Sequence, residues 1–141
     1  MPTFETGLSV TFHATHSLTG NFGPACEVHD HDYRVDVSVF GEHLTNESVL
    51  VDIVPLEKSI RSVVAQWDNQ NLDTQPELNG MNTTMEALAH YFHGRVSTAM
   101  REHSDLRVEV KVWETPTAWG AYRGPINAKS PDAATSGASG D

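Results

Sequence analysis

Two stretches of alternating apolar and polar residues open the chain, and they predict a pair of strands. Residues 3–16, TFETGLSVTFHATH, place apolar side chains at every second position from Leu8 to Ala14. Residues 31–40, HDYRVDVSVF, alternate in the same way, with Tyr33 and three valines on one face. A period of two is typical of a strand that buries one of its faces.

The segments around these strands are richer in turn residues. Residues 17–28 hold two glycines and a proline, and they are interpreted as a loop. The polar stretch 41–48 predicts a turn, and the apolar residues in 49–53 predict a short third strand.

The next stretch spaces its apolar side chains three or four residues apart. That period predicts an amphipathic helix over 55–67. Pro55 suits the first turn, where a missing N–H removes no helical hydrogen bond. After a polar loop over 68–82, Thr83 stands three residues before Glu86, which is the pattern of a capping box that starts a second helix.

The remaining residues predict the end of that helix, two strands and a tail. An apolar stripe continues to Met100, residues 107–115 alternate as a strand, and 119–122 resemble a last short strand. The predicted fold is α+β, an antiparallel sheet with two helices on one face, in one domain over 1–125. The Ala, Ser, Gly and Asp residues of 126–141 predict a disordered C-terminal tail.

Charge and composition narrow the functional classes. The net charge is −10, from 19 acidic and 9 basic residues, and the few basic residues are scattered, so we expect no nucleic-acid partner. No apolar run is long enough for a membrane span and the N-terminus does not resemble a signal peptide, so we expect a cytoplasmic protein. Cys26 is the single cysteine, either a reactive thiol or an inert small apolar residue.

Three histidines fall where two neighbouring strands would bring them together. His29 and His31 are two residues apart and therefore point to the same side. His16 ends the preceding strand, and a hairpin would place it beside that pair. Three neutral imidazoles with a free fourth position are what a catalytic zinc ion needs, although the same pattern fits surface histidines at a strand end. His13 has the opposite parity and is excluded from the group.

Glu114 ends the long strand 107–115, within the run VWETPTAW. A carboxylate at such a strand end could accept two parallel N–H bonds from an amino-substituted heterocycle. The alternative is a solvated glutamate at the end of a strand.

The segments FHATH, CEVHDHDYRVDV, WDNQNLD, TTMEALA and VWETPTAW resemble, in this order, those of the 6-pyruvoyl-tetrahydropterin synthase and 6-carboxy-tetrahydropterin synthase family. The resemblance runs from about residue 8 to residue 124. It implies a tunnelling fold (T-fold), in which strands of several subunits pair into a barrel, usually a homo-hexamer built as a dimer of trimers. The unblocked sheet edges leave room for such pairing.

The resemblance also implies roles for individual residues. The three histidines would bind Zn²⁺, and Glu114 would anchor the pterin ring at a subunit interface, with Thr83 or Thr84 nearby. The substrate would be 7,8-dihydroneopterin triphosphate, and the protein a zinc-dependent lyase in which Cys26 and Asp68 transfer protons. One of the two family activities leads to biopterin-like cofactors and the other to deazapurines of modified tRNA bases such as queuosine.

Three departures from the family pattern concern proton transfer and charge. Asn69 stands where a histidine is expected, and an amide cannot accept a proton near neutral pH. Ala25 occupies the position of the cysteine, which is displaced to Cys26, three residues before the first histidine of the pair. Asp30 and Asp32 replace Gly and Asn and add negative charge beside the predicted metal.

Three functional hypotheses follow from these departures. Cys26 is still the base, with His13 or His90 replacing the relay. Alternatively, the protein cleaves the side chain of a related dihydroneopterin with another base such as Glu27. In the third, it binds zinc and a pterin without turnover. A structural zinc would need a fourth protein ligand, for which Cys26 is the candidate.

Overall fold

The two alternating segments at the start of the chain form one long hairpin in the computed structural model, which describes residues 2–126. β1 spans Phe4–His16, β2 spans His29–Gly41, and the two are antiparallel along their whole length. The register pairs His16 with His29, so the predicted hairpin is confirmed and the histidines lie at its loop end.

Three further strands complete a sheet with the order β3-β1-β2-β4-β5. β4 (Arg107–Thr115) pairs antiparallel with β2, and β5 (Ala118–Pro125) pairs antiparallel with β4. β5 is therefore longer than the predicted 119–122. β3 (Gln70–Asn71) lies parallel to the end of β1, so the sheet is antiparallel apart from this short strand.

The predicted third strand over 49–53 is wrong, because this segment has no strand conformation. β2 already has β1 on one side and β4 on the other, so no edge beside it is free for the chain that follows. Val51 packs into the core, and the carboxylate of Asp52 accepts the backbone N–H of Val54 at the start of the first helix. Val51 is thus buried in the core, while Val49 is exposed, and the segment does not extend the sheet.

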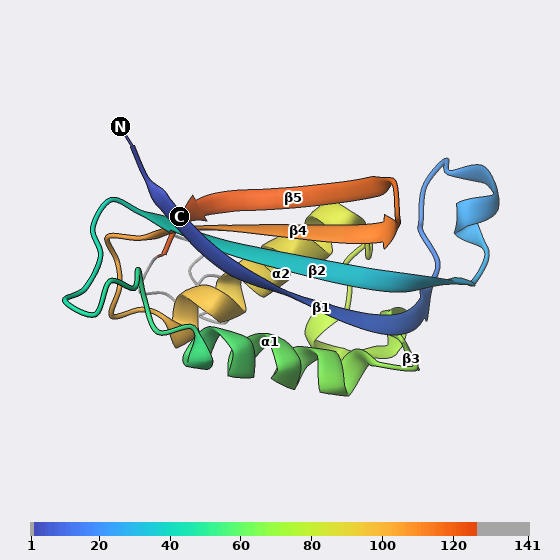
Figure 1. The fold of residues 1–141 in the computed structure, drawn as a ribbon. Coiled ribbons are helices and arrows are strands. Elements are labelled where there is room, and N and C mark those ends of the chain that lie inside the picture. Colours follow the sequence, from blue (N-terminus) through green and yellow to red (C-terminus); the bar gives the residue numbers. More distant parts are fainter. Residues whose placement is uncertain (1, 127–141) are drawn as a thin grey trace, which may run out of the picture.

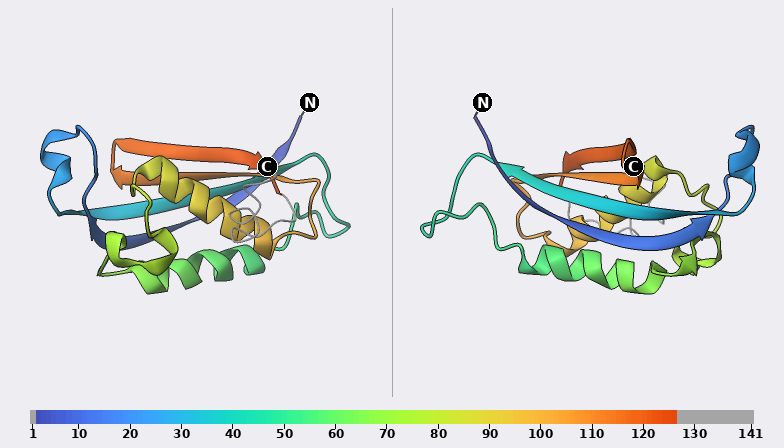
Figure 2. Two further views of the ribbon diagram at one scale, coloured as in Figure 1. Left: turned by 180° about the vertical axis from the view of Figure 1, so that it is seen from behind. Right: turned by 45° about the vertical axis from the view of Figure 1, so that its right-hand side comes forward.

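Both helices lie on the same face of the sheet, as predicted (Figures 1 and 2). α1 spans Val54–Trp67 and α2 spans Met85–Ala99. The cap of α2 is Thr84, whose hydroxyl accepts the N–H of Ala87 at 3.1 Å. The cap expected at Thr83 is therefore wrong by one residue, and Ala87 at the third position after Thr84 forms no capping box. The buried Thr83 side chain has a different role.

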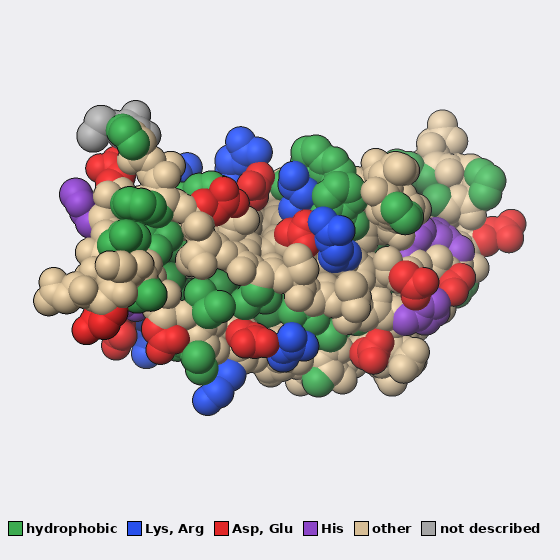
Figure 3. Space-filling model, in the orientation of Figure 1, with side chains coloured by type: hydrophobic (Ala, Val, Ile, Leu, Met, Phe, Trp, Pro, Cys, Tyr) green, Lys and Arg blue, Asp and Glu red, His purple; other side chains and the backbone are tan. Residues whose placement is uncertain are grey.

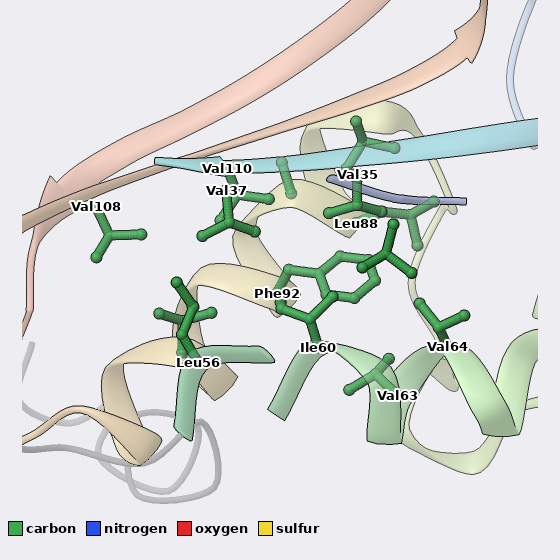
Figure 4. Close-up of a cluster of buried hydrophobic side chains, with 14 of the residues drawn as sticks. Val35, Val37, Leu56, Ile60, Val63, Val64, Leu88, Phe92, Val108 and Val110 are labelled. Atoms are coloured by element: carbon green, nitrogen blue, oxygen red, sulfur yellow. The ribbon is translucent and has the colours of Figure 1, made fainter. Parts of the chain in front are cut away.

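Apolar side chains from the inner sheet face and both helices form the core (Figure 4). Trp67, at the end of α1, is fully buried, and its ring centroid lies 5.1 Å from that of Phe92. Each such side chain contributes about 1.5–3 kcal/mol through removal from water. Along the hairpin, Phe12 stacks on Tyr33 at 5.0 Å, followed by the pair of Ala14 with His31 and then that of His16 with His29. The candidate site is therefore the polar end of the core.

The opposite face of the sheet is not covered by helices. Its side chains pair among themselves: Arg34 and the indole N–H of Trp113 both donate to Asp36, and the Lys111 ammonium lies 4.1 Å from the ring centre of Trp119. Figure 3 shows histidine and acidic side chains gathered at the end of the molecule where the β1–β2 loop lies.

Ile126 closes the described chain. It is buried, and its N–H donates to the carbonyl of Leu106. The rest of the predicted disordered tail, 127–141, lies outside the described residues. Within residues 2–126 no helix is long and apolar enough to cross a membrane.

Candidate functional site: a three-histidine centre

Three imidazole rings converge where the inner face of the hairpin reaches its loop. His16 faces His29 across the hairpin, and His31 follows two residues along β2 on the same side. Their ring centroids are 4.6 to 5.1 Å apart, and one nitrogen from each ring lies within 4.8 Å of the others. The structure therefore brings together the three histidines that the sequence pattern grouped.

Hydrogen bonds at the Nδ1 atoms fix the tautomers of two of these rings. His16 Nδ1 lies 3.0 Å from the carbonyl oxygen of Thr83, and His29 Nδ1 lies 2.7 Å from that of Glu27. A carbonyl oxygen only accepts, so each Nδ1 carries a proton, and in the neutral form of the ring Nε2 then has the lone pair. Both rings are thereby prepared to bind a metal through Nε2.

The Nε2 atoms of His16 and His31 are buried and have no hydrogen-bond partner among the described residues. Buried polar atoms in proteins are nearly always paired, so two unpaired nitrogens at one place point to a missing ligand. The Glu114 carboxylate lies 3.8 Å from His16 Nε2 and 3.7 Å from His31 Nε2, beyond hydrogen-bonding distance. A divalent cation such as zinc fits this donor set, since three imidazoles are typical of a catalytic site.

Burial favours the neutral form of two of these imidazoles, His16 and His31. It lowers the pKa of His16, and the neighbouring His29 and His31 lower it further through charge repulsion. Burial also lowers the pKa of His31, against the opposing effect of the Glu114 carboxylate. Neutral imidazole is the form that binds a metal, so His16 and His31 need not lose a proton near neutral pH to bind one.

The loop after β1 is attached by side chains to the segment before α2. Asp73 accepts the backbone N–H and the hydroxyl of Ser17 at 2.8 and 3.1 Å. Asn82 exchanges two hydrogen bonds of 3.0 Å with the backbone of Thr19. These contacts place Thr83 against His16, and the Thr83 hydroxyl also donates to Asp73 at 2.9 Å. Sequence reasoning missed Asp73, whose pattern is that of an ordinary turn residue.

The predicted substrate-binding residues divide into two groups. Glu114 faces the histidines and also lines a pocket of about 430 Å³, a volume within the usual range for small-molecule sites. The hydroxyls of Thr83 and Thr84 are engaged inside the chain, the first with Asp73 and the second as the cap of α2. The pocket is lined by Asp30, His31, Asp32, Arg34, Trp113, Glu114, Thr115 and Pro116.

The predicted proton-transfer residues lie outside the histidine group. Cys26 is exposed at the end of a short 3-10 turn, and its thiol donates to the carbonyl of Gly20 at 3.2 Å. Asp68 follows α1, and its carboxylate accepts the backbone N–H of His13 at 2.9 Å. Within residues 2–126, the side chains clustered as metal ligands are the three histidines, without Cys26. Cys26 is therefore not placed as a fourth ligand.

The two histidines considered as substitutes for the relay also face elsewhere. The His13 ring lies between Asp32 and Asp30, at 2.7 and 3.1 Å, on the sheet face opposite the histidine group. The hydrogen bond to Asp32 raises the pKa of His13. His90 is on α2 and lies against the ring of Tyr122, with 4.5 Å between centroids.

A second residue that sequence reasoning did not single out is Tyr33. Its ring lies 5.3 Å from that of His31, and its hydroxyl is buried without a hydrogen-bond partner in the described part of the chain. Burial raises the pKa of this phenol, so the hydroxyl stays protonated and can only act as a donor or as a neutral acceptor. Its signal in the sequence is its parity with the two histidines of β2.

The sheet with two helices on one face, together with the histidine centre at the end of the hairpin, defines a T-fold protein. The family model described as 6-pyruvoyl tetrahydropterin synthase matches residues 7–125. The chain therefore belongs to the 6-pyruvoyl tetrahydropterin synthase family.

Individual relatives agree with this assignment. The chain is 29% identical to a 6-pyruvoyl tetrahydrobiopterin synthase of Dictyostelium discoideum over 105 residues, which cover 73% of this chain and 76% of that one. It is 28% identical to a 6-carboxy-5,6,7,8-tetrahydropterin synthase of Bacillus subtilis over 128 residues, 85% of each chain. The structure of Caenorhabditis elegans 6-pyruvoyl tetrahydropterin synthase superposes with a TM-score of 0.76 at 26% identity, over 88% of this chain and 97% of that one. These relatives support a tetrahydropterin synthase-type function.

Proposed function

We propose that the protein is a zinc-dependent lyase that acts on 7,8-dihydroneopterin triphosphate, of the 6-pyruvoyl or 6-carboxy type. The observation that supports it most is the pair of buried, unpaired Nε2 atoms of His16 and His31, beside His29, whose Nδ1 is held by the carbonyl of Glu27. The relatives, which carry both activities in their names, supply the substrate class.

In this proposal His16, His29 and His31 hold the zinc ion through their Nε2 atoms. Zinc, when bound, supplies a Lewis acid that holds the side-chain hydroxyls of the substrate and acidifies the adjacent C–H bonds. Glu114 orients the pterin ring by accepting two N–H bonds from its amino-substituted edge. Glu114 lies within 4 Å of the Nε2 atoms of His16 and His31. One substrate molecule can therefore place its pterin ring on Glu114 and its side chain at the metal.

Proton transfer is assigned to Cys26 with Asp68. A base removes the proton of an acidified C–H bond, and the electron pair of that bond expels the triphosphate. The thiol of Cys26 now donates to Gly20, so it must release that carbonyl and lose its own proton before it can act. Asp68 is the carboxylate available at the end of α1, where it now holds the backbone of His13.

Two alternatives keep the same metal centre. A protein that binds zinc and a pterin without turnover is favoured by the separation of Cys26 and Asp68 from the histidine group, and by the amide at Asn69. Cleavage of a related dihydroneopterin side chain would use Glu27, whose backbone carbonyl already fixes His29.

A homo-hexamer, built as a dimer of trimers, and a cytoplasmic location stay predictions. The sheet face without helices and the exposed indole of Trp119 support assembly with further copies of the chain. Such assembly would supply groups from a neighbouring copy to the site.

The test is a product analysis by mass spectrometry. Zinc-loaded protein is incubated with 7,8-dihydroneopterin triphosphate, with and without an aldehyde-trapping reagent, and the matched control is His29→Ala. A 6-pyruvoyl or 6-carboxy product that is absent with the control supports the lyase and identifies its type. Unchanged substrate that nevertheless binds, measured by calorimetry, would replace the lyase by the pterin-binding alternative.

A further inference from the structure

A continuous hydrogen-bonded chain runs from one histidine of the centre to a carboxylate outside it. His16 Nδ1 lies 3.0 Å from the carbonyl oxygen and 3.1 Å from the hydroxyl oxygen of Thr83. The Thr83 hydroxyl lies 2.9 Å from Asp73 Oδ1. The chain thus has three members, His16, Thr83 and Asp73, and each neighbouring pair is within hydrogen-bond distance.

The direction of each hydrogen bond follows from the chemistry of the partners. An ionised carboxylate only accepts, so the Thr83 hydroxyl gives its proton to Asp73. The lone pairs of the same oxygen, and the Thr83 carbonyl, then face the Nδ1–H of His16. This arrangement disfavours the tautomer with a proton on Nε2, which could not bind a metal through Nε2.

Asp73 also fixes the backbone that carries His16. Its second oxygen, Oδ2, accepts the N–H and the hydroxyl of Ser17, the residue directly after His16. One carboxylate therefore orients the ring of this ligand through Thr83 and the end of its strand through Ser17. The other ligand with an assigned tautomer, His29, instead gives its Nδ1 proton to a backbone carbonyl two residues away.

We propose that Asp73 is a positioning residue of the metal centre, acting on His16 through the Thr83 hydroxyl. Groups that fix the outer nitrogen of a ligating histidine typically change metal affinity by about 10- to 100-fold. In Asp73→Asn the side-chain amide donates an N–H to the Thr83 oxygen. The Thr83 hydroxyl proton can then point to His16 Nδ1, which favours the His16 tautomer with its proton on Nε2 over the tautomer that binds a metal through Nε2. The inference rests on the proposed metal centre.

The experiment measures zinc affinity by competition with a chromophoric chelator, and the visible absorption spectrum of the Co²⁺-loaded protein. We expect Asp73→Asn and Thr83→Val each to weaken zinc binding about tenfold or more. Thr83→Ser keeps the hydroxyl and should restore most of the affinity. The double variant should bind zinc as tightly as the weaker-binding of the two single variants, because both changes break the same series of hydrogen bonds.

Asp32→Asn is the matched control, since it removes one carboxylate close to the centre whose partner is His13 and not the chain. We expect it to change affinity less than Asp73→Asn and to leave the Co²⁺ spectrum unaltered, whereas Asp73→Asn shifts it. Circular dichroism of the metal-free proteins checks folding; if Asp73→Asn does not fold, the Thr83→Val and Thr83→Ser pair decides. A wild type that binds no zinc would remove the metal centre itself. If the wild type binds zinc, and Asp73→Asn or Thr83→Val binds it equally well with an unaltered Co²⁺ spectrum, the role of Asp73 is overturned. The proposed metal centre would still stand in that case.

Discussion

The histidine centre and the proton-transfer residues are built in opposite ways. The three imidazoles project from two paired strands at positions fixed by the register, and His16 and His29 also hydrogen-bond to backbone carbonyls. Cys26 and Asp68 stand in connecting segments, are exposed, and use their functional atoms to hold the backbone of Gly20 and His13.

The difference has a physical origin. A strand pair places side chains with a period of two, so three ligands can be set in advance on one face at little cost in entropy. The connecting segments lack such a repeat, and their side chains take the nearest available partners. The three candidate metal ligands are therefore brought together within one chain. If the proposed lyase function holds, its proton transfer requires a rearrangement of the loop that carries Cys26, or residues of a neighbouring copy.

The largest expected effect comes from a change in the three-histidine centre. His29→Ala removes one of three nitrogen ligands, and we expect zinc content to fall from about one ion per chain to nearly none. Elemental analysis of purified protein measures this, with His43→Ala, an exposed histidine in the turn after β2, as the control. A His29→Ala protein that retains its zinc would show that the ion binds elsewhere.

The second largest effect is expected at Cys26, one of the two proposed proton-transfer residues. If Cys26 is the base, Cys26→Ala should lower kcat by about 10²- to 10⁴-fold, the usual contribution of a general base. Zinc content should stay unchanged, because Cys26 is not part of the histidine group. Steady-state kinetics and elemental analysis of the same sample give both numbers. Unchanged kcat would exclude Cys26, and Glu27→Gln would then be the next variant.

The parts of the fold and of the candidate site that the sequence predicts are those built on regular strands and helices. The hairpin, both helices and the grouping of His16 with His29 and His31 are all predicted by periodicity, because a regular backbone repeats its side-chain directions. The wrong third strand at 49–53 shows the limit. Its composition suits a strand, but strand pairing depends on which sheet edges are free, and no local pattern contains that information.

Side-chain contacts between residues far apart in the chain are not predicted by local sequence patterns either. Asp73 meets Ser17 across 56 residues of chain, and Thr83 meets His16 across 67. The pattern Thr-Thr before α2 correctly located the helix start, yet assigned the cap to Thr83 instead of Thr84. Helix propensity and capping rules fix a terminus only to within a residue or two.

Glu114 faces the histidine rings, and we expect its substitution to have a smaller effect than those of His29 and Cys26. Glu114→Gln keeps the shape but removes the charge that would pair with two N–H groups of the pterin, worth about 1.5–3 kcal/mol for a hydrogen bond to a charged group. We expect KM to rise about 10- to 100-fold at an unchanged zinc content, as measured by steady-state kinetics and elemental analysis. Loss of zinc with this variant would instead make Glu114 part of the metal site.

The smallest effect concerns a buried histidine that resembles the ligands in burial but not in bonding. His93, on α2, lies 3.2 Å from the carbonyl of Gly124 through Nε2 and 3.4 Å from the Ser97 hydroxyl through Nδ1. Both nitrogens therefore have partners, in contrast to the unpaired Nε2 of His16. This difference separates a structural histidine from a candidate ligand.

Burial lowers the pKa of His93 below its usual value of 6.5. The folded state then binds fewer protons than the unfolded state below pH 6.5, so the free energy of unfolding falls as the pH decreases from 6.5 toward the folded-state pKa. One such group changes stability by at most about 1.4 kcal/mol per pH unit. His16 and His31 act with the same sign in metal-free protein, so the contribution of His93 is read as a difference. Urea unfolding of metal-free wild type and His93→Gln at pH 7.5 and 5.5 should show a loss on acidification that is about 1 kcal/mol smaller in the variant. An equal loss in both proteins would mean that His93 is protonated as readily in the folded chain as in the unfolded one, and that burial at this position does not act as it does at the metal centre.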